Sequence, residues 1–509
     1  MAATPGGGRA EEALPLSELM PWQVPAPRTG REWVRSPDPE VLRRRWERLA
    51  GATPQERRLL FRPTRARTAD SPSGQLPGSR GATARLSRDP GPFPEPVRVR
   101  CGAFDRQWLL ADQRLLDAPR PELWRVADDA QVFLTLLPAP DGPVAAFSAE
   151  LPLASGPGRA GGRVAPLFRR PGGREPNLAP GLAEVLSGAF AAEVAALDVL
   201  AWVAAVTALP RAADPAGTAA PAGITAPGGS APADPAIPLP RAVELWARGV
   251  ELGRRILWLH TFGARAAAPD RPPGPPRMPG GRRPFVRQAF AGLPRTIGYD
   301  PDHEALLIGG EGRISPVAPG AWALRGESGE PALAAWFGRR ADRDWEPLPA
   351  PGEADPAPAP ASPAGAGRRV LPAQHRRRAP GGHQPGLLPE PQPEPATALG
   401  PDTEPAAGPE PAAEPGAGDP LPLPLEAVLP AEWPRLWTTE LTELASVLAL
   451  LAELAPELRA FGRELTAAPT LAAAELRRRG VLPVPPAARR PASVLGTAEE
   501  GPEGQFALL

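Results

Sequence analysis

The sequence predicts an α+β fold in which a mixed sheet is covered by helices. Residues 97–101 alternate like a strand, 131–137 are apolar and rich in β-formers, and 305–317 read as a hairpin. Longer stretches at 182–209 and 241–262 carry apolar residues at helical spacing. We therefore expect one sheet, built from the segments near 97, 131 and 305–317, with helices from 182, 241 and 439 packed on it.

Residues 1–60 are predicted to be an N-terminal docking segment, because Trp22 is followed at 41–60 by Leu42, Trp46 and Leu49 at helical spacing. The next stretch, 61–95, is Arg, Ser, Gly and Pro without apolar periodicity. Such a composition buries too little apolar surface to offset the entropy of ordering the chain. The sequence therefore predicts a flexible, exposed loop over 61–95.

A globular core is predicted at 96–345. In its strongest helix, 241–262, Trp246, Val250, Gly253 and Leu257 share one face, and further leucines widen that face, so the helix should be largely buried. The hairpin pairs 305–308 with 313–317 around the turn at 309–312. Residues 210–235 are mainly Pro, Ala, Gly and Thr and are predicted to be a disordered insert.

The C-terminal part is predicted to be a tether followed by a helix. Residues 346–425 are Pro-rich and acidic, with no arginine between Arg378 and Arg435, which indicates a disordered linker. Within 426–466, residues 439–461 carry a leucine stripe at helical spacing. We expect this amphipathic helix to dock on the core, with Thr438 or Thr439 as N-cap and a kink at Pro456, and 467–509 to be a tail.

The basic residues of this chain are unusual, because all 57 are arginine and there is no lysine. Together with the abundance of Ala, Pro and Gly, this is typical of codon bias in a G+C-rich genome. Counting arginines is therefore a weak argument for nucleic-acid binding.

The sequence predicts a cytoplasmic chain without membrane spans. The single cysteine, Cys101, excludes an intramolecular disulfide, and the N-terminus lacks the apolar run of a signal peptide. The most apolar stretch is interrupted by Glu193 and Asp198, which would be costly in a membrane.

Several catalytic classes need residues that this sequence does not contain. A P-loop motor and the common restriction-nuclease core each need a lysine. Amino-methyltransferases need an Asp/Asn-Pro-Pro-aromatic loop, but Asn177 is the only asparagine and no Pro-Pro pair precedes an aromatic residue. We therefore predict no enzyme activity and no cofactor.

No metal site is predicted either, because the four histidines are not clustered in the sequence. His260, at the end of an apolar helix, is interpreted as a packing or capping residue. Asp300–Glu304 is interpreted as a turn that precedes a strand. Catalytic roles for both remain the alternative at this stage.

Two motifs in the core resemble a known family. They are similar to the opening of the specificity region of Type ISP restriction-modification enzymes. The first is Val99–Trp108, which contains Phe104-Asp-Arg-Gln-Trp, and the second is Asp117–Trp124, which contains Asp-Ala-Pro-Arg-Pro. More matches follow in the family's order, at 176–180, 198–203, 237–239, 251–255, 259–260 and 314–322. The resemblance covers roughly 96–345, and the helix after Trp433 is a further match.

In that family the region follows a methyltransferase and reads an asymmetric DNA sequence. The resemblance therefore implies double-stranded DNA as the ligand and a target-recognition core at 96–345, with the methyltransferase or nuclease on separately encoded chains as possible partners. It implies no chemistry for this region itself. Because base-reading residues vary with the target sequence in the family, none can be transferred by position.

The chemistry of the residues themselves instead indicates candidate DNA contacts. A planar guanidinium can bind guanine O6 and N7 or clamp a phosphate, and it does so best on backbone that can approach closely. Two arginine groups lie beside Gly and Pro: Arg282, Arg283 and Arg287, next to Phe285, and Arg169, Arg170 and Arg174. The competing interpretation is that these are solvated loops in an arginine-rich chain.

Three functions remain open from the sequence. The first is a non-catalytic DNA sequence-recognition module, which the resemblance favours. The second is a protein-interaction scaffold that uses the acidic linker and the C-terminal helix, and the third is a decayed remnant without DNA binding. Salt-sensitive binding of duplex DNA distinguishes the first from the other two.

Overall fold

The computed structural model describes residues 13–72, 84–139, 143–154, 162–209, 234–268, 271, 274–278, 282–341 and 423–492, with the backbone of two short strands at 224–225 and 346–347. These residues belong to one compact unit, 1–353 with 422–509. The predicted insert at 210–235 and linker at 346–425 lie largely outside the described residues. So does the end of the predicted tail, from 493 onward.

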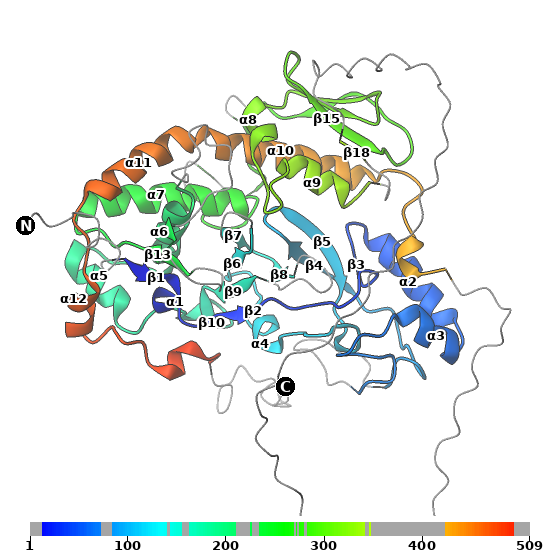
Figure 1. The fold of residues 1–509 in the computed structure, drawn as a ribbon, viewed down its shortest axis with the longest axis horizontal. Coiled ribbons are helices and arrows are strands. Elements are labelled where there is room, and N and C mark those ends of the chain that lie inside the picture. Colours follow the sequence, from blue (N-terminus) through cyan, green and yellow to red (C-terminus); the bar gives the residue numbers. More distant parts are fainter. Residues whose placement is uncertain are drawn as a thin grey trace, which may run out of the picture. The chain divides into compact units, whose positions relative to one another are not determined.

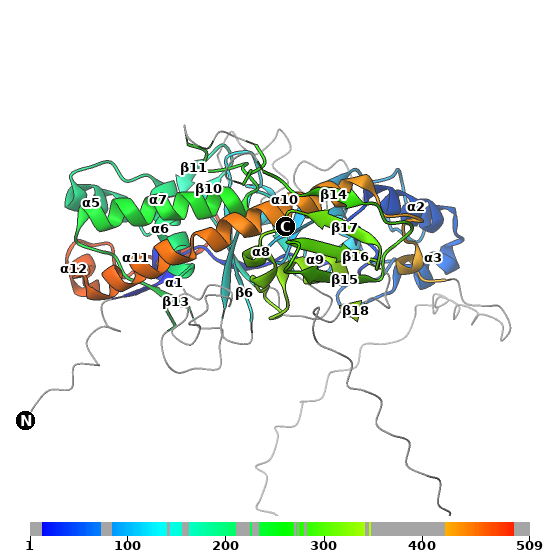
Figure 2. The same ribbon diagram turned by 90° about the horizontal axis from the view of Figure 1, so that it is seen from above.

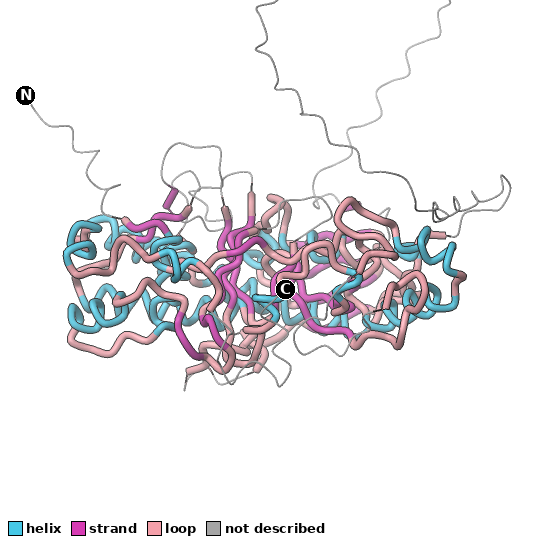
Figure 3. The backbone as a smooth tube through the Cα atoms, turned by 90° about the horizontal axis from the view of Figure 1, so that it is seen from below, coloured by secondary structure: helices cyan, strands magenta, loops and turns pink. Residues whose placement is uncertain are grey.

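Helices and several separate sheets make up this unit, which confirms the α+β class (Figure 1). The expectation of one sheet was wrong, because the segments near 97, 131 and 305–317 belong to three different sheets. Each pairs first with a neighbouring strand of its own hairpin, β4 with β5, β6 with β7, and β16 with β17, and such local pairing costs little loop entropy. In Figure 3 the strands form separate groups along the chain.

The first sheet has the order β3-β5-β4-β8, with bounds Arg35–Ser36, Asp105–Leu110, Pro96–Cys101 and Leu151–Leu153. β4 pairs antiparallel with β5 and parallel with β8. The second sheet is antiparallel with the order β2-β9-β6-β7, with bounds Val24–Pro25, Arg163–Pro166, Phe133–Leu137 and Val144–Ser148.

The third sheet has five strands in the order β14-β17-β16-β15-β18, with bounds Phe285–Gln288, Gly312–Ser315, Ala305–Ile308, Thr296–Asp300 and Glu346–Pro347. The predicted hairpin is confirmed as β16 and β17, and both Gly309 and Gly310 of its turn have positive φ angles. Two smaller sheets are β1-β13-β12 (Leu14–Pro15, Pro235–Ile237, Ile224–Thr225) and the hairpin β10-β11 (Phe168–Arg170, Arg174–Pro176).

Twelve α-helices lie in the described residues. The N-terminal ones are α1 (Leu16–Leu19), α2 (Pro39–Gly51), α3 (Pro54–Phe61) and α4 (Pro121–Trp124). The central ones are α5 (Leu182–Phe190), α6 (Ala196–Thr207), α7 (Val243–His260), α8 (Pro319–Ala323) and α9 (Ala332–Gly338). The C-terminal ones are α10 (Arg435–Glu453), α11 (Ala455–Ala467) and α12 (Ala473–Arg478).

Three stretches that were predicted as single helices are each two helices. The stretch 41–60 is interrupted where Thr53 and Glu56 form a capping box that starts α3. The stretch 182–209 is interrupted at Ala191, whose left-handed φ of 51° ends α5. The C-terminal stretch divides at Leu454, two residues before Pro456, whose missing N–H cannot continue the helix.

The C-terminal helix also begins earlier than predicted, because α10 starts at Arg435 after Pro434 and not at Thr438 or Thr439. α10 contacts α7, α8 and α9, and α11 contacts α7. Figure 2 shows α11 and α10 following one another along one side of the unit, with α7 alongside them. The helix therefore packs on the core in two pieces.

The segment 61–95 was predicted to be an exposed loop, and its described parts correct that expectation. They contain little regular structure, yet Ala69 and Leu86 are buried in a cluster with Trp33 and Phe61. The guanidinium of Arg114 donates to the backbone oxygens of residues 84, 89 and 90. The hydrogen bonds from this buried arginine hold the segment in place, although its sequence lacks apolar periodicity.

Asn177, the only asparagine of the chain, joins two distant segments. Its side chain is fully buried, accepts the N–H of Trp22, and donates to the carbonyls of Trp22 and Pro166. These bonds fix the N-terminal segment against β9.

A buried ion-pair network joins the first sheet to α9 and α10. Asp105 on β5 is fully buried and binds Arg340 at 2.6 Å and Arg339 at 2.7 Å. Arg340 also binds Glu440 of α10 at 3.1 Å, and Glu440 pairs with Arg98 of β4. Burial alone would raise the pKa of Asp105, but the charges of Arg340 and Arg339 hold it below its ordinary value.

We predict that Asp105→Asn lowers the free energy of unfolding by about 3–5 kcal/mol, because an amide removes the buried counter-charge that Arg339 and Arg340 share and leaves Arg340 with Glu440 alone. The control is Arg248→Ala, which removes the exposed Arg248–Glu464 pair and should cost at most about 1 kcal/mol. Urea unfolding followed by tryptophan fluorescence measures both. Equal losses for the two variants would contradict the importance of the network.

Helices α6 and α7 pack unusually closely at two glycines. A Cβ on Gly253 would lie 1.7 Å from the carbonyl oxygen of Ala201, and one on Gly249 would lie 2.3 Å from the Trp202 ring. The sequence predicted that Gly253 lies on the buried face of α7. The structure shows that α6 covers this position, so no side chain larger than that of glycine fits there.

We predict that Gly253→Ala destabilises the fold by about 1–3 kcal/mol, because the added methyl forces the two helices apart. Gly188→Ala in α5 is the matched control, since nothing lies within 4 Å of its added Cβ, and alanine there should add about 0.5–1 kcal/mol. Thermal unfolding of both variants should therefore move in opposite directions. A Gly253→Ala protein as stable as the wild type would contradict the close packing.

Candidate nucleic-acid interface

The five-stranded sheet has one face in the core and one face outside it. Ile297, Tyr299, Leu306, Ile308 and Ile314 belong to the main core cluster, α9 contacts β15, and the Tyr299 ring stacks on Trp322 of α8. Side chains alternate along a strand and cross-strand partners share a face. The opposite face therefore carries the other residues of the register: Phe285 with Ser315, and Leu307 with Arg313.

The edge strand β14 presents an aromatic ring and basic groups to solvent. All four of its residues are exposed, and 45% of Phe285 is accessible. The guanidinium of Arg287 lies over this ring, with Cζ 3.8 Å from the centroid, and its Nε donates to Ser315 Oγ at 3.3 Å. The pair forms a flat surface of one ring and one guanidinium, which suits contact with a base or a sugar.

Arg282 and Arg283 precede this strand and are both exposed. The nearest carboxylate to Arg282 is Glu304, at 3.9 Å, which is beyond hydrogen-bond distance and screened by solvent. Within the described residues, the Arg283 side chain has no hydrogen bond or ion pair. The structure thus brings Arg282, Arg283 and Arg287 together at one accessible edge.

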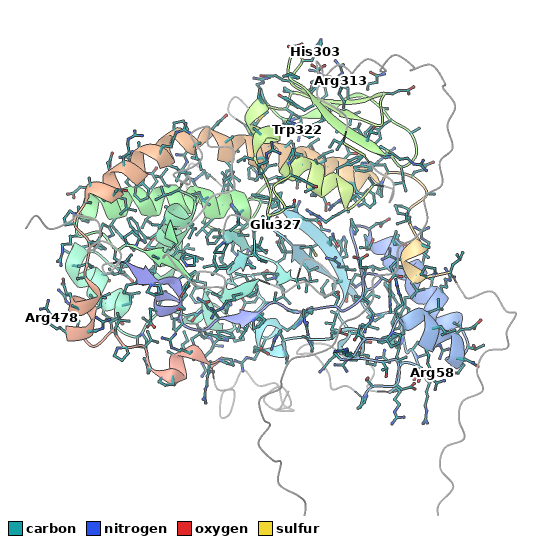
Figure 4. The ribbon with its side chains drawn as sticks, in the orientation of Figure 1. Arg58, His303, Arg313, Trp322, Glu327 and Arg478 are labelled. Carbon is teal, nitrogen blue, oxygen red and sulfur yellow. The ribbon has the colours of Figure 1, made fainter. Side chains whose placement is uncertain are left out.

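Sequence reasoning missed Arg313, which shares the outer face with this edge. Its guanidinium lies 3.6 Å from Asp300, and the Asp300 carboxylate also contacts His303 Nδ1 at 2.8 Å. Figure 4 shows His303 and Arg313 together on the five-stranded sheet. The alternation of β17 was the available signal, because Arg313 precedes the inward residue Ile314.

Asp300 acts as the turn former that the sequence predicted, since its carboxylate accepts the N–H groups of Asp302 and His303. Burial would raise its pKa, but the hydrogen bond and charge of His303 hold the pKa below its usual value. Among the described residues, no group of three or more His, Cys, Asp and Glu side chains could hold a metal ion.

The second predicted arginine group lies on the β10–β11 hairpin, and its side chains are used inside the fold. Arg169 pairs with Glu175 and donates to the carbonyls of Ala487 and Arg490, the second at 2.7 Å. Arg170 binds Glu175 at 2.7 Å. Only 15% and 21% of the Arg169 and Arg170 side chains are exposed. Arg174 is more exposed and donates to the carbonyl of Pro171.

His260 is a packing residue, as the sequence predicted. Its ring is buried against Phe104 and Phe147, and its Nδ1 accepts the N–H of Phe147 at 3.4 Å. Burial, with the positive charge of Arg100, lowers its pKa to about 3, so the ring is neutral at ordinary pH. Separately, no helix in the described part of the chain is long and apolar enough to cross a membrane.

Comparison with protein families identifies the chain. Residues 18–211 and 233–347 match the family described as the Type ISP C-terminal specificity domain. The chain belongs to this family. A comparison with curated proteins found no match.

Solved structures similar to this specificity domain are much longer chains. A DrdV–DNA complex matches with a TM-score of 0.40 and 16% identity, over 67% of this chain and 32% of that one. A nuclease-deletion mutant of the Type ISP enzyme LlaGI, in complex with a DNA substrate mimic, matches with a TM-score of 0.40 and 13% identity, over 65% of this chain and 25% of that one. The ATP-dependent Type ISP enzyme LlaBIII, bound to DNA, matches with a TM-score of 0.39 and 12% identity, over 62% of this chain and 20% of that one. The chain therefore spans about a third or less of each.

The motifs that resembled the family hold this specificity domain together. Asp105 lies at the centre of the buried network, and Asp117 binds Arg31 at 3.0 Å. Asp198 of one motif pairs with Arg254 of another at 2.7 Å. These residues are therefore structural, whereas Phe285, Arg287 and the arginines before them lie outside the motifs that carried the resemblance.

Proposed function

We propose that this chain is a DNA sequence-recognition module that contacts duplex DNA with the outer face of its five-stranded sheet. The observation that carries the proposal is the exposed edge at β14, where Arg287 lies over Phe285 and Arg282 and Arg283 precede it, with no carboxylate closer than 3.9 Å among the described residues. Guanidinium groups held in this way are suited to guanine edges and phosphates. The specificity-domain family supports the same function.

The β10–β11 arginines are less suited to this role, because Arg169 and Arg170 already bind Glu175 and the C-terminal segment. Releasing a paired guanidinium to bind a phosphate costs the interactions that it already makes. We therefore favour Arg282, Arg283 and Arg287 as direct contacts and assign Arg169 a structural role. Arg174 is the member of that hairpin best placed to reach a ligand.

We further propose that modification and cleavage of DNA are performed elsewhere, by a methyltransferase or nuclease that works with this module. The support is chemical, since these 509 residues contain no lysine for a P-loop or a nuclease core and a single asparagine, Asn177, which is fully buried. On this proposal the module acts in the cytoplasm, with the DNA. No step of catalysis is assigned to its own side chains.

We predict that the purified chain enriches an asymmetric sequence from a pool of random duplexes. Replacing Arg282, Arg283 and Arg287 by Ala should weaken binding to the enriched duplex and reduce its preference over random DNA, because each lost base contact removes about 1–3 kcal/mol of discrimination. Fluorescence anisotropy across a salt series measures both effects.

The matched control is the triple variant Arg248→Ala, Arg255→Ala and Arg479→Ala, which removes the same charge from arginines that are already paired with glutamates. Its binding should resemble that of the wild type. A wild-type chain that binds no duplex at low salt would refute the proposed function. If DNA binds but both triple variants behave alike, the assigned face is wrong.

A further inference from the structure

We propose that the segment that follows the N-terminal helices carries a second DNA-contact surface, which binds the phosphate backbone without reading sequence. We call it the Arg85 surface and define it as the side chains of Arg65, Arg85 and Arg88, beside the Arg58–Asp70 pair. It lies on the segment 61–95, which was predicted to be a loop and which is distant in sequence from the strands of the five-stranded sheet. The inference rests on the proposed function, since it extends the contact of the same partner.

Inward-facing arginines give this surface a fixed frame. Arg57 of α3 donates to the carbonyls of Leu49, Ala50 and Ser87, so one guanidinium joins α2, α3 and the 84–91 segment. Arg67 donates to the carbonyls of Leu116 and Pro72 in the same manner. A backbone held by such bonds presents its outward side chains in one arrangement, which lowers the entropy lost on binding.

The outward-facing arginines of the same segment are exposed and have excess positive charge. Arg65, Arg85 and Arg88 make no side-chain hydrogen bond or ion pair with any described residue. Residues 54–72 and 84–91 contain seven arginines and three carboxylates, an excess of four positive charges. Figure 4 shows Arg58 at the outer side of α3.

The three carboxylates of the segment are already occupied. Glu56 caps α3 by binding Thr53, and Asp89 accepts the N–H of Gly91. Asp70 binds Arg58 at 2.8 Å and also accepts from Ser87. The hydrogen bond from Arg58 lowers the pKa of Asp70 most, followed by that from Ser87, and the charge of Arg85 adds to them. The carboxylates therefore leave Arg65, Arg85 and Arg88 available.

Several arginines elsewhere in the described part of the chain are paired with carboxylates, whereas Arg65, Arg85 and Arg88 are not. Around α6, α7, α11 and α12 the pairs are Arg248–Glu464, Arg255–Glu457, Arg241–Glu475, Arg479–Glu475 and Arg254–Asp198. Exposed arginines without a described partner also occur on α11 and α12, as Arg463, Arg477 and Arg478. The Arg85 surface is therefore distinguished by its fixed backbone and its excess of positive charge, and not by unpaired arginines alone.

Phosphate is the ligand that best fits this surface. Protein interfaces have an apolar centre, but Leu59 is the only large apolar side chain of the described segment that is strongly exposed. Base reading uses an element that enters a groove, such as the strand β14 that Arg282 and Arg283 immediately precede, whereas Arg65, Arg85 and Arg88 neither lie on a helix or strand nor immediately precede a strand. Arginines on a fixed, irregular backbone are typical of contacts that position a protein on a duplex without reading it.

The test compares three triple variants of the full chain on the enriched duplex and on random duplex. Arg65→Ala, Arg85→Ala and Arg88→Ala together should weaken binding to both duplexes by the same factor, about tenfold or more at low salt. The slope of log K against log salt should fall in magnitude by about 2.7, at about 0.9 for each phosphate contact. The β14 variant should instead lose preference for the enriched duplex, and the variant of paired arginines should lose neither.

Circular dichroism and thermal unfolding should show that the Arg85-surface variant folds like the wild type, because its three side chains make no described contacts. Unchanged affinity and slope in this variant, with a wild type that binds DNA, would overturn the inference and leave the proposed function standing. The same outcome is expected if the surface binds an acidic protein segment. Lack of binding by the wild type would refute the proposed function itself.

Discussion

The buried carboxylate of Asp105 fixes the geometry on which the candidate interface depends. It binds two consecutive arginines at the end of α9, and one of these reaches Glu440 of α10, more than 90 residues further along the chain. α9 contacts β15, so this network also fixes the five-stranded sheet and its outer face. Charges buried in this way are costly unless each has a partner with good geometry. The network therefore specifies one arrangement of β5, α9 and α10.

Arginine performs two different tasks in this chain, although composition alone cannot separate them. Arg57, Arg114 and Arg169 are turned inward and satisfy backbone carbonyls, which lets segments of irregular structure pack. Arg283 and Arg85 are exposed and without a described partner. The first kind explains why a chain with so much Pro and Gly has a defined fold, and the second kind marks the surfaces available to an anionic ligand.

Local patterns predicted local structure well. The hairpin of β16 and β17 followed from alternation around a glycine turn, and α7 followed from one apolar face, because both signals lie within about 20 residues. Breaks inside apolar stretches were missed, since nothing in the composition of 182–209 marks the left-handed residue Ala191. The assignment of three strand segments to one sheet failed because strand pairing is not encoded in the strands alone.

Long-range partners were beyond the reach of the sequence. Arg169 and Arg282 look alike in sequence, each beside Gly and Pro, but the carbonyls that occupy Arg169 come from residues more than 300 positions away. Asp105 belongs to a motif that resembles the family, yet its arginine partners lie 234 and 235 residues away. Choosing between candidate contacts therefore required the fold, whereas the family could be suspected from the order of short motifs.

Backbone amide hydrogen exchange of the full chain, with and without its selected duplex, tests the central claim most directly. The free edge of β14 lacks a strand partner on one side, so its amides should exchange readily in the free protein. We expect saturating DNA to slow exchange at 282–288 and 312–315 and to leave α7 and α11 unchanged. Unchanged exchange at both segments, with protection confined to the β10–β11 hairpin or the C-terminal helices, would contradict the assigned face.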